Sequence, residues 1–354
     1  MHVIPEWLEL VSLVFCAGVI ICRLWVLSAA TESEFSYQTV FVPKMWRLFC
    51  FGIAVLIVGS IIEFLVRTSG ITGQPFPSYF SAVPTVLFKT HYGHVWIVRM
   101  VALGLLALSK TVVRYRDTRP FLVLMLLLAL TVSGTASASG HASDAGDLSV
   151  PEIVDWLHLL AVCFWGGGLM VLSLFVLPDL VTREGAVLPL ISRVASSFSG
   201  MAGIAVGVIA VSALYNLWYY VRFLEALWKT PYGLAVMAKI ILFLVLICLG
   251  AYNRYVNVPL LAESAGLSAK RKSLIGRSAD KFFSWFKRKP DSAEIPERFK
   301  RRVGIETLLI LGTLFCAALL RHEIPARHMA HMGHIKEDGT FHRMDDHGPH
   351  DPSN

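Results

Sequence analysis

Residues 232–253 read YGLAVMAKIILFLVLICLGAYN, and this stretch holds a single charged side chain, Lys239. An α-helix needs about 20 consecutive, mostly apolar residues to cross the hydrocarbon core of a bilayer. The whole chain has the same character, because 55% of its 354 residues are hydrophobic and 16% are charged, against about 25% charged in a typical soluble domain. A mean hydropathy of +0.60 therefore indicates a membrane protein and excludes a disordered chain or a single soluble enzyme domain.

Seven further apolar stretches have the length of a membrane span, so we expect an all-α polytopic membrane protein with about eight transmembrane helices. The first stretch does not resemble a cleaved signal peptide, because no Lys or Arg precedes it and no small-residue cleavage site follows a short apolar core. The six cysteines lie singly in these stretches without a CxxC pair, which favours buried packing over disulfides. The expected spans are 7–29, 45–67, 94–109, 119–138, 151–177, 196–221, 232–253 and 303–320.

The distribution of Lys and Arg predicts the orientation of the chain. Connecting segments on one side of the bilayer carry 21 of the 32 Lys and Arg residues, and those on the other side carry 8. Cytoplasmic segments hold the excess of positive charge, so both termini are expected outside the cytoplasm. The net charge of +7 is thus attributed to topology. The expected partner is the lipid bilayer, and no nucleic acid is expected.

Short matching segments predict an internal repeat. The offset between them corresponds to four spans, and an even number of spans preserves orientation, which predicts a parallel four-plus-four arrangement. The expected organisation is a first four-helix half (1–140), a second half (141–320) with a basic cytoplasmic loop at 254–302, and a His/Met-rich extracytoplasmic tail (321–354). The matches are residues 89–93 (KTHYG) with Arg99 against residues 229–233 (KTPYG) with Lys239, and Pro5-Glu6 against Pro151-Glu152.

Charged residues inside the spans need a reason, because each costs at least about 2.5–3.5 kcal/mol at the bilayer centre. Most of them fall in the predicted outer third, whereas the inner half offers Arg23, Asn253, Arg254 and Glu306 without a histidine. The deep cations Arg99 and Lys239 are expected to pair with Glu63 or Asp155. The side chains interpreted as reaching the interface are Glu6, Glu9, Arg67 and His91. The small residues Gly166, Gly167 and Gly168, beside Trp165, predict close helix packing.

Histidines near the outer span ends predict a metal site. His91 and His94 are three residues apart, as are Asp155 and His158, so each pair shares one helix face. His141 follows the fourth span in a turn rich in Gly, Ser and Ala. Imidazole is the commonest protein ligand of transition ions. The predicted metal ligands are therefore His94, His141 and His158, with His91 and Asp155, where Asp155 either ligates the metal or orients His158.

The C-terminal segment predicts copper as the metal. Seven of the twelve histidines fall between Arg321 and Asn354, and methionines alternate with them. Thioether sulfur selects Cu(I), whereas imidazole serves Cu(I) and Cu(II). Calcium and magnesium prefer oxygen ligands, and zinc gains little from methionine. We expect a copper-capturing tail whose core ligands are His328, Met329, His331, Met332 and His334.

These residues resemble the CopD/PcoD family of bacterial copper-resistance membrane proteins. The resemblance is strongest from about residue 130 to residue 255 and covers most of the membrane part. It implies an eight-span inner-membrane protein that handles copper, commonly described as copper uptake, often beside a small periplasmic copper carrier, CopC. It supports His141 and His158 as site residues. The motifs that carry it are SGHA (139–142), DWLHLLA (155–161) with WGG (165–167), TPYG (230–233) to Lys239, and Asn253-Arg254.

Three functions fit the sequence, and none of them is enzymatic. The leading interpretation is copper transport, in which the tail captures copper and passes it to the outer-half histidine site. The first alternative is a membrane protein of electron transfer that binds haem b between His94 and His158, since histidines on neighbouring helices can clamp a haem. The second alternative is a copper-delivery protein that moves no ions across. No nucleotide-binding motif is present, which excludes ATP-driven pumping by this chain alone.

Overall fold

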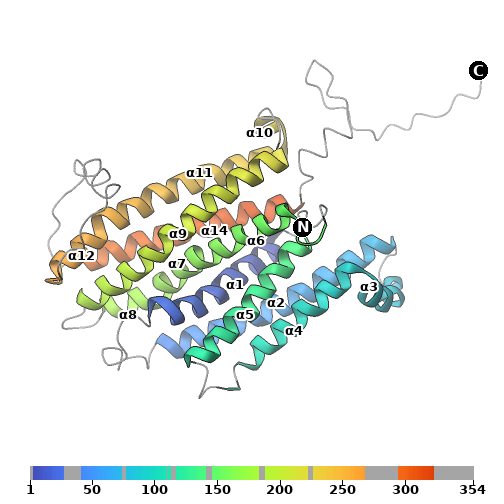
Figure 1. Cartoon of the computed structure of the whole chain (residues 1–354), viewed down its shortest axis with the longest axis horizontal. Helices are drawn as coiled ribbons and strands as arrows, with labels where there is room; N and C mark the ends of the chain where they lie inside the picture. Colours follow the sequence, from blue (N-terminus) through green and yellow to red (C-terminus); the bar gives the residue numbers. More distant parts are fainter. Residues whose placement is uncertain are drawn as a thin grey trace, which may run out of the picture.

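The computed structural model describes residues 3–27, 41–73, 77–109, 111–112, 117–140, 146–182, 188–221, 226–267 and 294–322. All regular elements in these ranges are helical, and eight helical spans are long and apolar enough to cross a membrane. Successive spans run in opposite directions through one bundle (Figure 1). The chain is therefore an all-α, multi-pass membrane protein, as the sequence predicts.

Several spans consist of more than one helical element, because short π-helical turns interrupt them. Two of the spans are also preceded by short helices: η2 (Ser78–Ala82) and α3 (Val83–Lys89) come before α4, and α10 (Ala226–Lys229) comes before α11. The spans are α1 (Val3–Ile21) with η1 (Cys22–Val26); α2 (Phe41–Thr72); α4 (His91–Leu108); α5 (Arg119–Ala138); α6 (Val150–Val162) with η4 (Cys163–Gly167), α7 (Gly168–Val171), η5 (Leu172–Val176) and α8 (Leu177–Val181); α9 (Leu188–Val221); α11 (Pro231–Tyr252) with η6 (Asn253–Asn257) and α12 (Val258–Ser264); and α14 (Ile295–His322).

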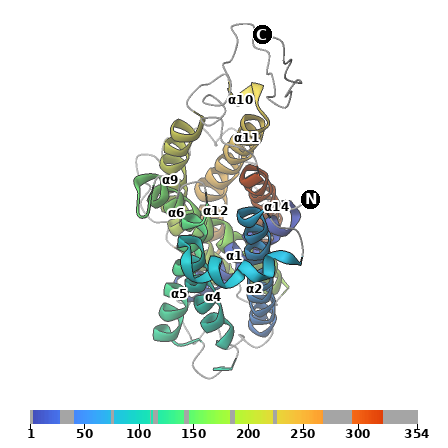
Figure 2. The same ribbon diagram turned by 90° about the vertical axis from the view of Figure 1, so that its right-hand side faces the viewer.

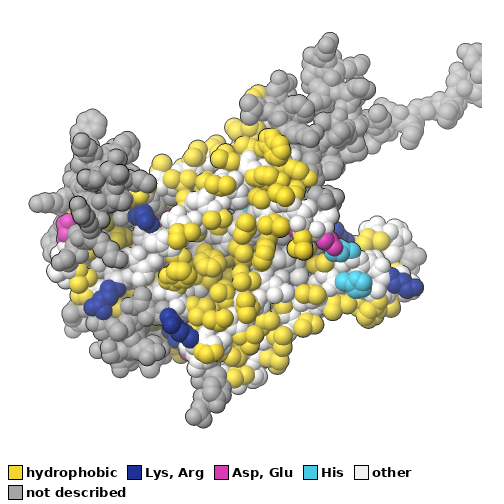
Figure 3. All heavy atoms as spheres, in the orientation of Figure 1, with side chains coloured by type: hydrophobic (Ala, Val, Ile, Leu, Met, Phe, Trp, Pro, Cys, Tyr) yellow, Lys and Arg dark blue, Asp and Glu magenta, His cyan; other side chains and the backbone are white. Residues whose placement is uncertain are grey.

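The first span is the centre of the bundle. Helix α1 packs against α2, α5, η4 and α14, and Figure 2 shows it among α2, α5 and α14. In the first span 67% of the apolar window is buried, against 6% in the span that begins at Pro231. The apolar side chains that are not buried cover the flank of the molecule, where Figure 3 shows mostly hydrophobic groups. Such a surface is compatible with lipid and not with water.

Glycines allow α1 and the fifth span to make backbone contact. A methyl group added at Gly18 would overlap the backbone of Gly167, and one added at Gly167 would overlap the carbonyl oxygen of Val14. A methyl group added at Gly168 would likewise lie only 2.5 Å from the Phe198 ring of α9. Small residues permit this close approach in membranes, where packing drives helix association. The prediction of a close-packing face at Gly166–Gly168 is confirmed.

The helices are longer than the apolar stretches that predicted them. The predicted ends of the seventh and eighth spans were wrong, because the helix continues from residue 253 to Ser264 and α14 begins at Ile295 rather than 303. The predicted loop 254–302 is accordingly shorter. Hydropathy stops at the first polar residues, whereas these polar residues continue the helices through hydrogen bonds to one another. The tail from residue 323 onward lies outside the described residues.

The two predicted repeat segments have the same local structure. Thr90 caps α4 by accepting a hydrogen bond from the Gly93 amide (3.0 Å), and Thr230 caps α11 by accepting one from the Gly233 amide (2.9 Å). A threonine that accepts an amide hydrogen bond near the first turn is a common helix start. The match is local, and the four-plus-four repeat stays a prediction.

Candidate functional site

One group of polar side chains within the spans lies at one end of the bundle, which we call the rim. The rim is the end where α1, α4, α6 and α11 begin and where α2, α5, α9 and α14 finish (Figure 1). Figure 3 shows histidine side chains at this end. Ionisable residues inside a membrane bundle mark functional sites by default, because each is costly to bury.

Arg99 is held by a network that joins three helices at the rim. Its Nη1 donates to Glu63 Oε2 of α2 (2.9 Å), and its Nε and Nη2 donate to Thr135 Oγ1 (3.2 Å) and the Thr135 carbonyl (2.9 Å) of α5. Nη2 also donates to Ser139 Oγ (2.6 Å). Of the two predicted partners, Glu63 and Asp155, the structure pairs Arg99 with Glu63. Because the guanidinium side chain is 8% exposed, it acts as a structural cation between α2, α4 and α5.

Replacing Arg99 with methionine is expected to destabilise the protein by about 2–3 kcal/mol. Removing one partner of a fully buried ion pair costs about 3–5 kcal/mol, because the other charge is left uncompensated. Glu63 is 32% exposed, so part of that cost is relieved by water. Thermal unfolding in detergent, followed by the monodisperse fraction on size exclusion, measures the effect. The double variant Arg99→Met/Glu63→Met should recover part of the stability, and equal losses in the single and double variants would contradict the pairing.

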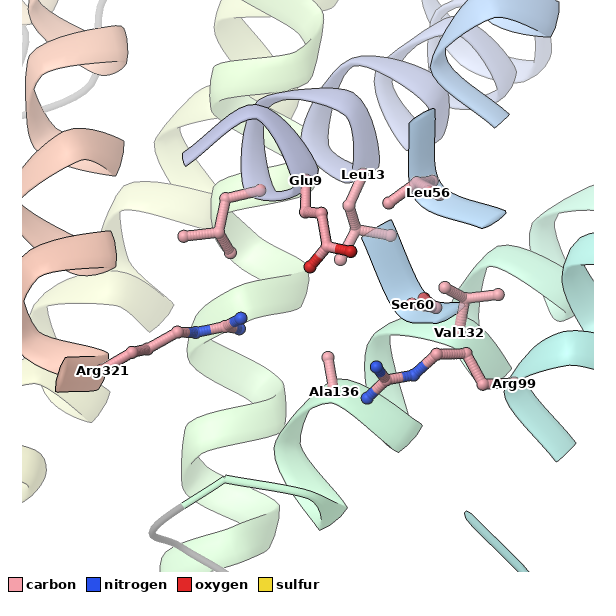
Figure 4. Close-up of a pocket in the computed structure, with 9 residues that line it drawn as sticks. Glu9, Leu13, Leu56, Ser60, Arg99, Val132, Ala136 and Arg321 are labelled. Carbon is pink, nitrogen blue, oxygen red and sulfur yellow. The ribbon is translucent and has the colours of Figure 1, made fainter. Parts of the chain in front are cut away.

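Glu9 lies inside the bundle, contrary to the interpretation that it reaches the interface. Its carboxyl group lines a pocket between α1, α2, α4, α5 and α14 (Figure 4), and its Oε1 is buried with no hydrogen-bond partner among the described residues. The pocket has a volume of about 30 Å³. The position of Glu9 near the helix start suggested an exposed residue, but α14 and α2 cover this face of α1. The pocket is lined by Glu9, Leu10, Leu13, Leu56, Ser60, Arg99, Val132, Ala136 and Arg321.

His158 projects from α6 toward α9, where its protonation state is fixed by hydrogen bonding. Its Nδ1 lies 2.9 Å from Ser212 Oγ. The Ser212 hydroxyl donates to the carbonyl of Val208 (2.6 Å) or Ile209 (3.1 Å), so it has no second proton to give to the ring. We therefore assign the proton to Nδ1, which donates to Ser212 and leaves the lone pair of Nε2 available to a metal.

Asp155 and Lys239 accompany His158. Asp155 Oδ2 accepts a hydrogen bond from Ser137 Oγ of α5 (2.8 Å), so it is fixed between α5 and α6. Lys239 of α11 lies within electrostatic range of both Asp155 and His158. The negative charge of Asp155 thus lies near the positive charge of Lys239, beside His158.

His91 and His94 make contacts that hold the start of α4. His94 Nε2 lies 3.1 Å from the carbonyl oxygen of Phe88, which can only accept, so Nε2 carries the proton. His91 Nε2 lies 3.4 Å from Asp147 Oδ1, and both side chains are more than half exposed. These two histidines therefore sit at the water-facing part of the rim.

No three His, Cys, Asp or Glu side chains converge on one metal position in the part of the chain that the structure describes. Helix α5 packs against both α4 and α6, and so lies between the helices that carry His94 and His158. The predicted ligands His141 and His328–His334 lie outside the described residues. The haem alternative gains no support, because the His94 Nε2 that would bind iron donates to a carbonyl oxygen.

At the opposite end of the bundle a hydrogen-bonded chain runs from Arg302 to a buried carboxylate. Arg302 Nη1 donates to Asn257 Oδ1 (2.7 Å), Asn257 Nδ2 donates to Asn253 Oδ1, and Asn253 Nδ2 donates to Glu306 Oε1 (2.7 Å). The donors of Arg302, Asn257 and Asn253 follow one another toward Glu306, so the buried carboxyl group of Glu306 accepts a hydrogen bond inside the bundle. This network fastens η6 to α14 and explains why the helices continue past the apolar stretches.

Eight spans with a group of ionisable side chains at the rim define a polytopic membrane protein with a polar site near the bilayer surface. A family model described as copper resistance protein D matches residues 192–320, and one described as the copper resistance protein D-like N-terminal domain matches residues 2–150. The chain belongs to the CopD family of copper resistance proteins.

Two curated relatives carry copper in their names. The chain is 28% identical over 223 residues to the copper transport protein CutJ of Bacillus subtilis (strain 168), a match that covers 60% of this chain and 40% of the relative. It is 26% identical over 206 residues to copper resistance protein D of Pseudomonas syringae pv. tomato, a match that covers 56% of this chain and 65% of the relative. The matches therefore span less than two thirds of the length of either relative. No solved structure gives a significant match.

Proposed function

We propose that this protein transports copper ions across the bacterial inner membrane, in the direction of uptake, with the rim and both termini on the extracytoplasmic side. The observation that carries the proposal is the 2.9 Å contact between His158 Nδ1 and Ser212 Oγ. With the proton assigned to Nδ1, the lone pair of Nε2 can bind a metal ion. Membership of a copper resistance family and the relative named as a copper transport protein support copper as the substrate. The excess of Lys and Arg on the other side supports the orientation.

The proposed copper site is centred on His158. His141 is the ligand that completes it. The tail residues His328, Met329, His331, Met332 and His334 capture copper and pass it to this site, since soft and imidazole ligands suit both copper oxidation states. Asp155 supplies the negative charge beside Lys239. His91 and His94, at the water-facing part of the rim, are the positions where copper is first captured, from solution or from a periplasmic CopC-like carrier.

Copper uptake by the purified full chain in proteoliposomes tests the proposal directly. Vesicles that contain the protein should accumulate more copper than protein-free vesicles. This should hold with either Cu(I) or Cu(II) in the external solution. Binding without accumulation would replace transport by copper delivery. An absorption spectrum of the same sample with a Soret band would instead favour the haem-binding alternative.

Removing residues 323–354 is expected to slow uptake on the order of tenfold at limiting copper and to leave uptake at saturating copper unchanged. A tail that carries several ligands raises the effective copper concentration at the rim, which matters only when free copper is scarce. Uptake rates across a range of buffered copper concentrations measure this effect. A matched tail in which all His and Met residues are replaced by Ser should behave like the deletion. An equal reduction at all copper concentrations would contradict the capture role.

A further inference from the structure

Glu9 occupies a site that is built around its carboxyl group and that the copper site does not use. A methyl group added at Gly59 of α2 would overlap this carboxyl group and would lie 2.6 Å from Glu9 Cγ, so the glycine makes the room in which Glu9 sits. Glu9 Oε1 is buried and accepts no hydrogen bond within the described part of the chain. A carboxylate in this position is costly, whereas a neutral carboxyl group is tolerated.

The charged groups around Glu9 come from four helices. Glu6 lies on the same helix, Glu63 comes from α2, Arg99 from α4 and Arg321 from α14. Helix α5 contributes only Val132 and Ala136 to the pocket, and the Tyr92 hydroxyl of α4 lies within electrostatic range of Glu9. Arg99 is already committed to Glu63, as their 2.9 Å contact shows. Among the residues that the structure describes, the cation left to balance an ionised Glu9 is Arg321, which is exposed at the end of α14 (Figure 4).

The pocket connects Glu9 to water. Its volume of about 30 Å³ accommodates about two water molecules, since one needs roughly 10–15 Å³ by this measure. Arg321 at one side of the pocket is exposed and Ser60 at the other is buried, so the pocket leads from the rim into the bundle. Water in this space can carry a proton between the rim and Glu9.

We propose that Glu9 is a proton-binding site, and that its proton exchange compensates the charge of the ion that the protein moves. In one state the carboxyl group is neutral and rests against Gly59. In the other state the proton has passed to pocket water as hydronium, and the carboxylate is balanced by Arg321. No electron is transferred and no other bond is broken. The coupling to ion movement rests on the proposed copper transport, whereas the proton site does not.

Infrared difference spectroscopy of the full chain in lipid tests the proton site without copper. The wild type should show the carbonyl stretch of a protonated carboxyl group, shifted in D₂O, that disappears as pH is raised. This band should be lost in Glu9→Gln and kept at a shifted position in Glu9→Asp. Glu152→Gln is the matched control, because Glu152 is also buried but accepts the Leu148 amide hydrogen bond at 2.7 Å. Identical bands in the wild type and Glu9→Gln across the pH range would overturn the proposal.

Proteoliposomes that contain a pH-sensitive dye test the coupling. Copper uptake by the wild type should move protons in the opposite direction, and Glu9→Gln should lose this proton movement while it retains copper binding. Unchanged proton movement in Glu9→Gln would overturn the coupling. If neither protein takes up copper, the transport function fails, and the infrared result still decides whether Glu9 binds a proton.

Discussion

Replacing Gly167 with alanine is expected to destabilise the protein by about 3 kcal/mol. The new carbon would fall on the backbone of α1 at Val14 and Gly18. Backbone atoms cannot rotate away as a side-chain end can, so α1 and the fifth span must separate. Overpacking typically costs about 1–3 kcal/mol, and rigid contacts lie at the upper end of that range. Because α1 is central, the loss spreads to its contacts with α2, α5 and α14.

Matched glycine variants separate this packing effect from the general effect of alanine in a helix. Gly207→Ala in α9 and Gly104→Ala in α4 add the same methyl group where no atom lies within 4 Å. Both should be neutral or stabilising, since alanine favours a helix over glycine by about 1 kcal/mol. Thermal unfolding in detergent compares the three variants. Equal melting temperatures for Gly167→Ala and the controls would mean that α1 and the fifth span do not meet at these glycines.

The sequence predicted the number of spans because length and hydropathy are properties of single segments. The span 119–138 agrees with α5, Arg119–Ala138, since charged and turn-forming residues flank it directly. The seventh and eighth spans are longer than their predicted bounds, because their helices continue through Asn253, Asn257 and Arg302. These side chains hydrogen-bond to partners far away in the sequence. Such partners become visible only once the helices are packed.

The contacts of the candidate site residues also divide into those that the sequence could predict and those that depend on how the helices pack. The pairing of Arg99 with Glu63 was predictable, because a deep cation needs an anion at a similar depth and few are available. The interior position of Glu9 was not, because it depends on Gly59 in another helix. Likewise, i,i+3 spacing places His91 and His94 on one face, but it does not reveal that His94 donates to Phe88. Helix spacing determines a face, and only the neighbouring helices determine what that face contacts.

Replacing His158 with asparagine is expected to weaken copper binding by at least about 100-fold. Asparagine can still donate to Ser212 but has no equivalent of the imidazole Nε2, so the structural contact survives while the proposed ligand is lost. Loss of an outer partner alone typically costs about 10–100-fold in metal affinity, and loss of a ligand should exceed that. Competition with a copper chelator, using the full chain and Cu(I), measures the affinity.

Ser212→Ala should weaken binding by about tenfold, because it removes the acceptor that keeps the proton on His158 Nδ1 and orients the ring. Ser173→Ala is the matched control, since Ser173 likewise bonds a carbonyl of its own span, that of Met170 at 3.5 Å, but has no histidine beside it. It should leave the affinity unchanged. This graded series separates a ligand from a structural histidine, because a purely structural His158 would leave the copper affinity of the asparagine variant unchanged. Wild-type affinity in His158→Asn would place the copper site elsewhere on the rim.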